Sequence, residues 1–173
     1  MKKPILILLR HGQSAWNQKN LFTGWVDVPL TPKGIEEALA AGEAIKEIDF
    51  GAVFTSGLIR AQMTAALAMS VHGGGKDLVF QHGDESSASM RAIHSEEARG
   101  ALIPAYMSDA LNERAYGAIQ GMNKDRAREE YGEEQVHIWR RSFDVPPPEG
   151  ESLELTMART LPYFEKEIVP HLE

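Results

Sequence analysis

A chain of 173 residues is long enough for one domain, because a domain usually takes about 100–200 residues. With 43% hydrophobic and 25% charged residues, its composition excludes a disordered or collagen-like protein. The net charge of −7 argues against broad nucleic-acid binding, which needs a basic face, so any bound anion requires a local cationic pocket.

The first predicted element is a strand over residues 5–9. This run is aliphatic at every position, which is typical of a strand buried on both faces of a parallel sheet. It is far shorter than the roughly 20 residues that cross a bilayer, and the basic start at Met1-Lys2-Lys3 is not followed by the apolar segment of a signal peptide. We expect a cytoplasmic protein without a membrane partner, and the absence of cysteine fits a reducing compartment.

A helix is predicted to begin after Thr31, a good N-cap, with Pro32 at the first helical position. A short strand over residues 52–55 and a second helix over residues 58–69 follow. This alternation predicts an α/β fold. The apolar residues of the first helix that share one face are Ile35, Ala38, Leu39, Gly42 and Ile45.

The pattern weakens over residues 70–101, which begin with a glycine run and contain one possible strand at 78–80. We interpret this segment as a mobile insertion within a single domain of residues 1–173. Helices are then predicted over 123–130 and 133–141, separated by Gly132.

Three consecutive prolines, residues 146–148, exclude regular structure before a last helix, in which Pro162 predicts a kink. This helix is expected to bury one apolar face against the sheet. The face consists of Leu153, Met157, Leu161, Phe164 and Ile168.

Chemistry is first indicated by Arg10-His11-Gly12, directly after the first predicted strand. Ligands of open parallel sheets bind beyond the carboxyl ends of the strands. A neutral imidazole is a nucleophile, a guanidinium holds a phosphoryl group through two hydrogen bonds, and glycine permits close approach. On these three residues alone, a histidine that merely packs at a strand end is an equally good interpretation.

Further motifs strengthen the chemical interpretation, because their joint pattern is far more specific than any one of them. The sequence closely resembles the cofactor-dependent phosphoglycerate mutases of the histidine phosphatase superfamily over most of residues 4–173, most weakly over 70–101. The motifs are Arg10-His11-Gly12-Gln13-Ser14-Ala15-Trp16-Asn17, Phe22-Thr23-Gly24-Trp25, Leu58-Ile59-Arg60-Ala61, Leu111-Asn112-Glu113-Arg114-Ala115-Tyr116-Gly117, Gly121-Met122-Asn123-Lys124 and Trp139-Arg140-Arg141.

The resemblance implies a three-layer sandwich around a mostly parallel sheet and the interconversion of 3-phosphoglycerate and 2-phosphoglycerate in glycolysis and gluconeogenesis. In this reaction 2,3-bisphosphoglycerate primes the histidine, and no metal is used. The resemblance makes His11 the phosphorylated nucleophile and Glu113 the general acid and base, with Arg10 and Arg60 around the phosphoryl group. It assigns substrate binding to Ser14, Asn17, Thr23, Gly24, Arg114, Tyr116, Lys124, Arg140 and Arg141.

The charge balance supports a cationic pocket. Without the six arginine and lysine residues of the implied site, the net charge of −7 would become −13, so these cations would focus anionic substrates on an otherwise acidic protein. Arg140-Arg141 alone would be interpreted as a solvated helix face, and within the set we favour ligand binding. The histidines at positions 72, 82, 94 and 137 show no metal-ligand spacing.

The sequence departs from the family at its carboxyl-terminal end. The resemblance implies a second catalytic histidine in a His-Gly turn after a further strand, and His171 matches neither feature. We therefore expect an incomplete fold, with an open pocket and an exposed apolar strip beside the first strand. Phosphoglycerates are the expected partners, and homo-oligomerisation stays open. A histidine-type phosphatase and an inactive phosphoglycerate-binding fragment are the alternatives.

Overall fold

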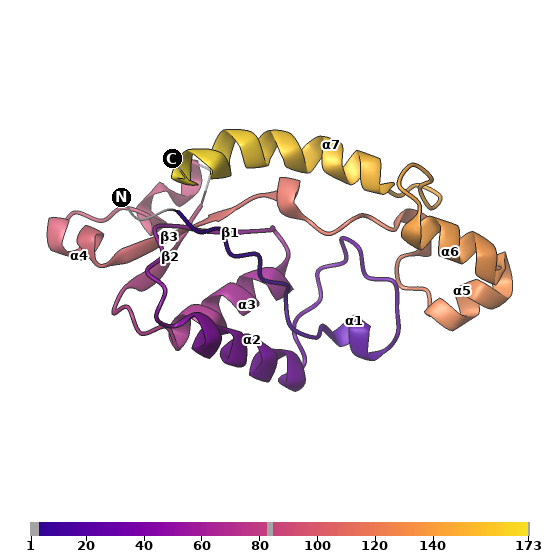
Figure 1. Cartoon of the computed structure of the whole chain (residues 1–173), viewed down its shortest axis with the longest axis horizontal. Helices are drawn as coiled ribbons and strands as arrows, with labels where there is room; N and C mark the ends of the chain where they lie inside the picture. Colours follow the sequence, from indigo (N-terminus) through magenta and orange to yellow (C-terminus); the bar gives the residue numbers. More distant parts are fainter. Residues whose placement is uncertain (1–3, 83–84, 173) are drawn as a thin grey trace.

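The computed structural model describes residues 4–82 and 85–172. The molecule is elongated, with a small sheet and both ends of the chain at one end (Figure 1). Helices α2 (Pro32–Ile45) and α3 (Ile59–Ser70) lie on one side of the sheet, and α7 (Leu153–Tyr163) runs along the other side (Figure 1). This arrangement confirms the expected layered α/β architecture. Among the described residues, no helix combines the length and the apolar character that a membrane span requires.

The sheet has three parallel strands in the order β1 (Val53–Thr55), β3 (Leu102–Met107) and β2 (Asp77–Gln81). The prediction of β1 is confirmed. The central strand β3 was not predicted, although Ile103 and Ala105 are completely buried. Its Pro104 argues against a central strand because proline cannot donate a ladder hydrogen bond, yet it pairs in register with Val79.

The segment 70–101, expected as a mobile insertion, contains the edge strand β2, which includes the strand predicted at 78–80. A short 3-10 helix, Glu85–Met90, and helix α4 (Glu96–Gly100) follow. Residues 83–84 of this segment lie outside the described residues.

Helix α2 begins as predicted. The Thr31 hydroxyl accepts a hydrogen bond from the Gly34 amide at 3.1 Å, and Pro32 occupies the first turn. Gly42 faces α3, where a Cβ atom would overlap the Ala68 carbonyl oxygen. The close contact between α2 and α3 therefore depends on the missing side chain of Gly42.

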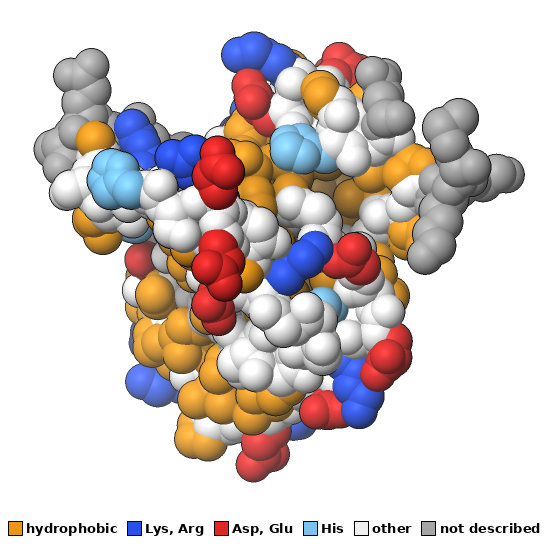
Figure 2. Space-filling model, turned by 90° about the vertical axis from the view of Figure 1, so that its left-hand side faces the viewer, with side chains coloured by type: hydrophobic (Ala, Val, Ile, Leu, Met, Phe, Trp, Pro, Cys, Tyr) orange, Lys and Arg blue, Asp and Glu red, His pale blue; other side chains and the backbone are white. Residues whose placement is uncertain are grey.

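The prediction of a buried strand at residues 5–9 is wrong. Residues 4–13 form no strand, and Ile5 and Leu8 are 69% and 87% exposed. A strand requires a neighbouring strand for its ladder hydrogen bonds, and none of the three strands pairs with this segment. The expected apolar strip beside a first strand therefore has no strand to lie beside, and the exposed aliphatic side chains are those of residues 5–9 themselves. Figure 2, which views this end, shows hydrophobic side chains at the surface.

A second packing centre lies at the other end of the molecule (Figure 1). Helices α5 (Lys124–Tyr131) and α6 (Glu133–Arg141) are separated, as predicted, at Gly132, which has φ 87°. Their inner faces close over the loop that follows the one-turn helix α1 (Ala15–Gln18). The buried cluster contains Phe22, Ile119, Ala127, Val136 and Trp139.

Helix α7 presents a different face from the one predicted. Leu153, Met157 and Leu161 are exposed, whereas Ile168, in the π-helical turn Phe164–Ile168 after Pro162, is buried. The helix instead turns Arg159 and Thr160 towards the chain at residues 109–113, to whose carbonyl oxygens both donate hydrogen bonds. Hydrogen bonds, and not the periodicity of apolar residues, therefore determine which face of α7 is turned inward.

Candidate active site

His11 lies between the irregular segment 4–10 and helix α1, with its side chain partly buried. Its Nδ1 atom is 2.7 Å from the Gly12 carbonyl oxygen. Since a carbonyl oxygen only accepts hydrogen bonds, Nδ1 carries the proton and, in the neutral ring, Nε2 keeps its lone pair. The tautomer inferred from this contact is the one that a nucleophilic Nε2 requires.

The environment of His11 favours the neutral ring. Burial lowers the pKa of His11 below its usual value of 6.5, and the nearby positive charges of Arg60 and Arg10 lower it further. The Gly12 carbonyl and the Glu113 carboxylate act in the opposite direction without reversing the shift. At neutral pH the imidazole is therefore unprotonated and able to attack an electrophile.

The turn around His11 is fixed by main-chain contacts. The Gly12 amide donates to the Thr64 hydroxyl at 3.3 Å, and this hydroxyl donates to the Arg60 carbonyl at 2.7 Å. A Cβ atom on Gly12 would overlap the Gly34 carbonyl oxygen. Glycine at position 12 is thus required for the close approach of this turn to helix α2.

Arg60 is the most buried cation of the site, with 1% of its surface exposed. Its guanidinium donates to the carbonyl oxygens of Gly24 at 2.6 Å and Val26 at 3.0 Å. It also donates to Glu113 Oε2 at 2.9 Å. Because Glu113 is 38% exposed, this ion pair joins a fixed buried cation to a carboxylate that solvent and ligands can reach.

The loop after His11 contains the next group of implied residues. Ser14 is buried and caps α1, where the Ser14 and Asn17 side chains each accept a hydrogen bond from the other residue's amide at 3.2 Å. Thr23 is also buried, and its hydroxyl has no hydrogen-bond partner in the described structure. Gly24 has φ 55°, a left-handed conformation that favours glycine.

Arg114 is a second buried cation of the site and packs against the Tyr116 ring. The Arg114 guanidinium lies 5.0 Å from the Tyr116 ring centroid and donates to its hydroxyl at 3.2 Å and to the Arg140 carbonyl at 2.9 Å. Its Nη1 atom is buried and lacks a partner among the described residues. A buried guanidinium nitrogen without a partner needs a ligand or a water molecule.

Lys124, at the start of α5, adds a further cation. Burial lowers the pKa of Lys124, and the charges of Arg140, Arg128 and Arg10 lower it further, whereas Glu113 raises it. Lys124 is therefore within electrostatic reach of Arg140, Arg10 and Glu113. Arg141 is exposed in the last turn of α6.

Three further side chains contact the chain around Glu113 and were not identified from the sequence. Trp25 Nε1 donates to the Glu113 carbonyl at 2.7 Å, and Arg159 Nη2 donates to the same oxygen at 3.1 Å. Glu151 accepts from Arg159 Nε at 2.7 Å and from the Ala115 amide at 2.9 Å. Trp25 belongs to the motif Phe22-Thr23-Gly24-Trp25, which could have indicated it. Arg159 lies in helix α7 and Glu151 just before it, and a polar residue in or near an amphipathic helix is too common a signal to identify either one.

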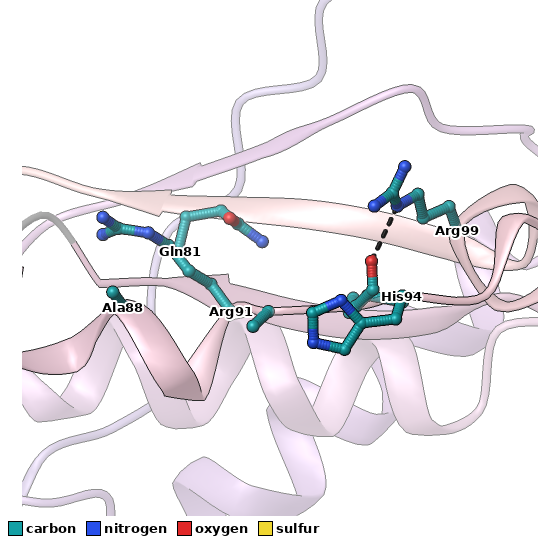
Figure 3. Close-up of a pocket in the computed structure, with 7 residues that line it drawn as sticks. Gln81, Ala88, Arg91, His94 and Arg99 are labelled. Carbon is teal, nitrogen blue, oxygen red and sulfur yellow. Dashed lines mark hydrogen bonds between the residues drawn. The ribbon is translucent and has the colours of Figure 1, made fainter.

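A hollow of about 440 Å³ lies apart from His11, between β2 and α4 (Figure 3). Arg91, His94 and Arg99 line it. Its guanidinium groups do not converge: Arg91 extends away from His94, and Arg99 Nε donates to the Ile93 carbonyl at 2.8 Å (Figure 3). Among residues 4–82 and 85–172, no three carboxylate or histidine side chains are grouped as metal ligands. The cations around His11 therefore remain the best candidate for an anion site.

Comparison with curated proteins identifies close relatives. The chain is 60% identical over 169 residues to a 2,3-bisphosphoglycerate-dependent phosphoglycerate mutase of Protochlamydia amoebophila, with 97% of this chain and 75% of the relative covered. It is 56% identical to the protein of the same name from Chlamydia muridarum, with 98% and 74% covered. Both alignments include the His11, Arg60 and Glu113 regions, because they span nearly the whole chain.

The family model of the histidine phosphatase superfamily (branch 1) matches residues 6–83 and 76–171. Among solved structures, Bacillus stearothermophilus YhfR has a TM-score of 0.69 at 25% identity, covering 94% of this chain and 66% of that one. A mycobacterial glucosyl-3-phosphoglycerate phosphatase complexed with VO3 has a TM-score of 0.70 at 21% identity, covering 92% and 62%. The chain thus spans slightly less than two thirds of these two structures, and the second likeness concerns the fold alone.

Proposed function

The chain belongs to the histidine phosphatase superfamily, and from this premise we propose that it is a phosphoglycerate mutase that carries a phosphoryl group on His11. The reaction interconverts 3-phosphoglycerate and 2-phosphoglycerate, which makes these glycolytic metabolites its partners and the cytoplasm its location. The observation that carries the proposal is the contact of His11 Nδ1 with the Gly12 carbonyl, which leaves Nε2 available for attack. Burial and the charges of Arg60 and Arg10 lower the pKa of His11 and favour the neutral ring.

The arginines around His11 fit phosphoryl transfer. The transition state spreads negative charge over three oxygens, so fixed cations stabilise it without further reorganisation. Arg60 is fixed by the Gly24 and Val26 carbonyls, and Arg10 contributes charge from the segment before His11. We therefore assign both arginines to the transferred phosphoryl group.

The rest of the site fits a doubly phosphorylated primer. Two polar atoms, Thr23 Oγ1 and Arg114 Nη1, are buried without a partner in the described structure, and both can donate to anionic oxygens. We assign the substrate carboxylate and the second phosphate to Arg114, Tyr116, Lys124 and Arg140. When bound, 2,3-bisphosphoglycerate supplies the phosphoryl group that primes His11. Ser14, Asn17, Gly24 and Arg141 complete the proposed pocket.

We propose that His11 acts as the nucleophile and Glu113 as the general acid and base in two phosphoryl-transfer steps. His11 Nε2 forms a bond to phosphorus while the bond from phosphorus to the substrate oxygen breaks, and that oxygen takes the electron pair. Glu113 in its protonated form donates a proton to this oxygen. In the return step Glu113 accepts the proton of the attacking hydroxyl, whose oxygen forms a bond to phosphorus while the bond between Nε2 and phosphorus breaks and Nε2 takes back its electron pair.

The proposal is tested by following the phosphoryl group in two stages, first onto His11 and then from His11 to 3-phosphoglycerate. The chain is mixed with 2,3-bisphosphoglycerate, and an acid-labile phosphoryl group is sought on the peptide that contains His11. The phosphorylated chain is then isolated and mixed with 3-phosphoglycerate. We expect the adduct to form and then to disappear as bisphosphoglycerate appears. Failure of His11 to become phosphorylated by 2,3-bisphosphoglycerate, or an adduct that persists after 3-phosphoglycerate is added, would contradict the proposal.

A phosphatase is the second candidate, in which water accepts the phosphoryl group. The cations beyond Arg60 argue against it, because Arg114, Lys124 and Arg140 add anion contacts that would retain a bound phosphoglycerate. The same two-stage experiment separates the functions. Loss of the adduct as inorganic phosphate indicates a phosphatase, and binding of phosphoglycerate without any adduct indicates an inactive binding protein.

A further inference from the structure

Arg159, in the middle of α7, donates hydrogen bonds to four main-chain carbonyl groups between residues 109 and 113. Its Nη1 atom donates to Asp109 at 3.2 Å and to Ala110 at 2.9 Å. Its Nη2 atom donates to Asn112 at 2.9 Å and to Glu113 at 3.1 Å. One guanidinium therefore fixes the main chain immediately before and at Glu113.

Glu151 fixes the chain on the other side of Glu113. Its carboxylate accepts from Arg159 Nε and Nη2, at 2.7 and 2.9 Å, and from the Ala115 amide at 2.9 Å. The side chains of this ion pair are only 20% and 19% exposed, so solvent screens the pair less than it screens a surface ion pair. The segment 109–115 is thus connected to α7 both before and after Glu113.

Trp25 completes this arrangement from the opposite loop. Its indole nitrogen donates to the Glu113 carbonyl at 2.7 Å, and the Arg159 guanidinium lies 5.3 Å from its ring centroid. The residues on either side of Trp25 accept hydrogen bonds from Arg60 through their carbonyl oxygens. The loop that fixes Arg60 therefore also fixes Glu113, the ion-pair partner of Arg60.

We propose that Arg159 and Trp25 are positioning residues that hold the Glu113 main chain so that its carboxyl group reaches the oxygen leaving or attacking the phosphoryl group. The proposal rests on the proposed function of His11 and Glu113. A displacement of about 1 Å in a reacting group can reduce the rate on the order of 100-fold. Two donors share the Glu113 carbonyl, so removing either one leaves a single donor and loosens the main chain that sets the carboxyl position.

If Arg159 and Trp25 only supported the fold, their removal would slow phosphorylation of His11 with every phosphoryl donor. The choice of donor therefore distinguishes a positioning role from a structural one. With 2,3-bisphosphoglycerate the leaving oxygen is an alkoxide that needs a proton from Glu113. With 4-nitrophenyl phosphate the leaving nitrophenolate is stable as an anion and departs without a proton. A mispositioned Glu113 therefore slows phosphorylation of His11 only with the first donor, whereas a damaged fold slows it with both.

The experiment compares Trp25→Phe and Arg159→Met with the unchanged chain. Trp25→Phe retains an aromatic ring and removes the N–H that donates to Glu113, so it tests positioning even where Arg159→Met weakens the fold. Arg99→Met is the matched control, because Arg99 also donates to a main-chain carbonyl but lies on α4. The rate of phosphohistidine formation is measured with each donor, with near-ultraviolet circular dichroism as a check on the fold.

We expect Trp25→Phe and Arg159→Met to slow phosphorylation by bisphosphoglycerate about 10- to 100-fold, with less than about a twofold change for nitrophenyl phosphate. The Arg99→Met control should behave as the unchanged chain does with both donors. Equal losses with both donors in Trp25→Phe, or no loss with either, would overturn the positioning role. Failure of the unchanged chain to react with bisphosphoglycerate would instead overturn the proposed function on which the positioning role rests.

Discussion

Two adjacent segments of this chain contradict the simple relation between hydropathy and burial. Residues 5–9 are all aliphatic, yet Ile5, Leu6, Leu8 and Leu9 are exposed. Residues 12 and 14, glycine and serine, are buried. The difference lies in their partners: Gly12 contacts Thr64 and Gly34, and Ser14 caps α1, whereas no strand pairs with the aliphatic run. Burial in this part of the chain follows hydrogen bonding and close backbone contact.

The largest effect is expected from His11→Gln, which tests whether the polar segment carries the chemistry. Glutamine can still hydrogen-bond near Gly12 but offers no nucleophilic nitrogen, so phosphoryl transfer should fall on the order of 1,000-fold or more. Steady-state mutase assays measure the loss, and a thermal unfolding curve checks the fold. Activity within about tenfold of the unchanged chain would exclude His11 as the nucleophile.

A smaller but clear effect is expected from Gly12→Ala, which tests the close backbone contact. The added methyl group would overlap the Gly34 carbonyl oxygen, and the backbone must move to relieve it. We expect the free energy of unfolding to fall by about 1–3 kcal/mol, as in an overpacked core. Chemical denaturation measures it, with Gly51→Ala as control, because a Cβ at Gly51 meets no atom within 4 Å. Equal stabilities would show that the turn is not tightly packed.

The pH dependence tests the charges around His11. Protonation occupies the Nε2 lone pair, so transfer is lost as the pH falls through the pKa of His11, and the lowered pKa places this acid limb below pH 6.5. Arg10→Met removes a cation that lowers this pKa, and the limb should shift to higher pH by a fraction of a unit. Arg126→Met serves as control, because Arg126 lies on α5 and is not among the charges that shift the pKa of His11. A limb above pH 6.5 in the unchanged chain would contradict the lowered pKa.

The smallest effect is expected from Leu8→Ala, the counterpart of Gly12→Ala four residues earlier. Leu8 is 87% exposed, so its truncation removes little buried surface, and the free energy of unfolding should change by less than about 0.5 kcal/mol. The same denaturation experiment measures it. A loss above about 2 kcal/mol, typical of a buried leucine, would mean that residues 5–9 are packed in solution.

Local signals predicted the helices well and the sheet less completely. Thr31-Pro32 and Gly132 marked helix boundaries correctly, because capping and left-handed glycine depend on neighbouring residues. The strand at 5–9 and the central strand β3 were misjudged because strand pairing is a long-range property. Pro104 disfavours a strand locally, but β3 forms because it pairs with both β1 and β2.

The candidate site was predicted unevenly for a similar reason. Arg10, His11, Arg60 and Glu113 stand in motifs, and the structure brings them into one electrostatic cluster. Arg159 lies instead on a helix whose apolar residues suggested a buried face, and that face is exposed. Its importance follows from main-chain acceptors 46–50 residues away in sequence, which no local pattern reveals.

The central claim is that His11 carries the phosphoryl group on Nε2, because Nδ1 is committed to the Gly12 carbonyl. Nuclear magnetic resonance of the chain labelled with ¹⁵N at histidine, after reaction with 2,3-bisphosphoglycerate, identifies the phosphorylated nitrogen through its coupling to phosphorus. The account predicts coupling at Nε2 of His11 and a proton retained on Nδ1. Phosphorylation at Nδ1, at another histidine, or at none would contradict it.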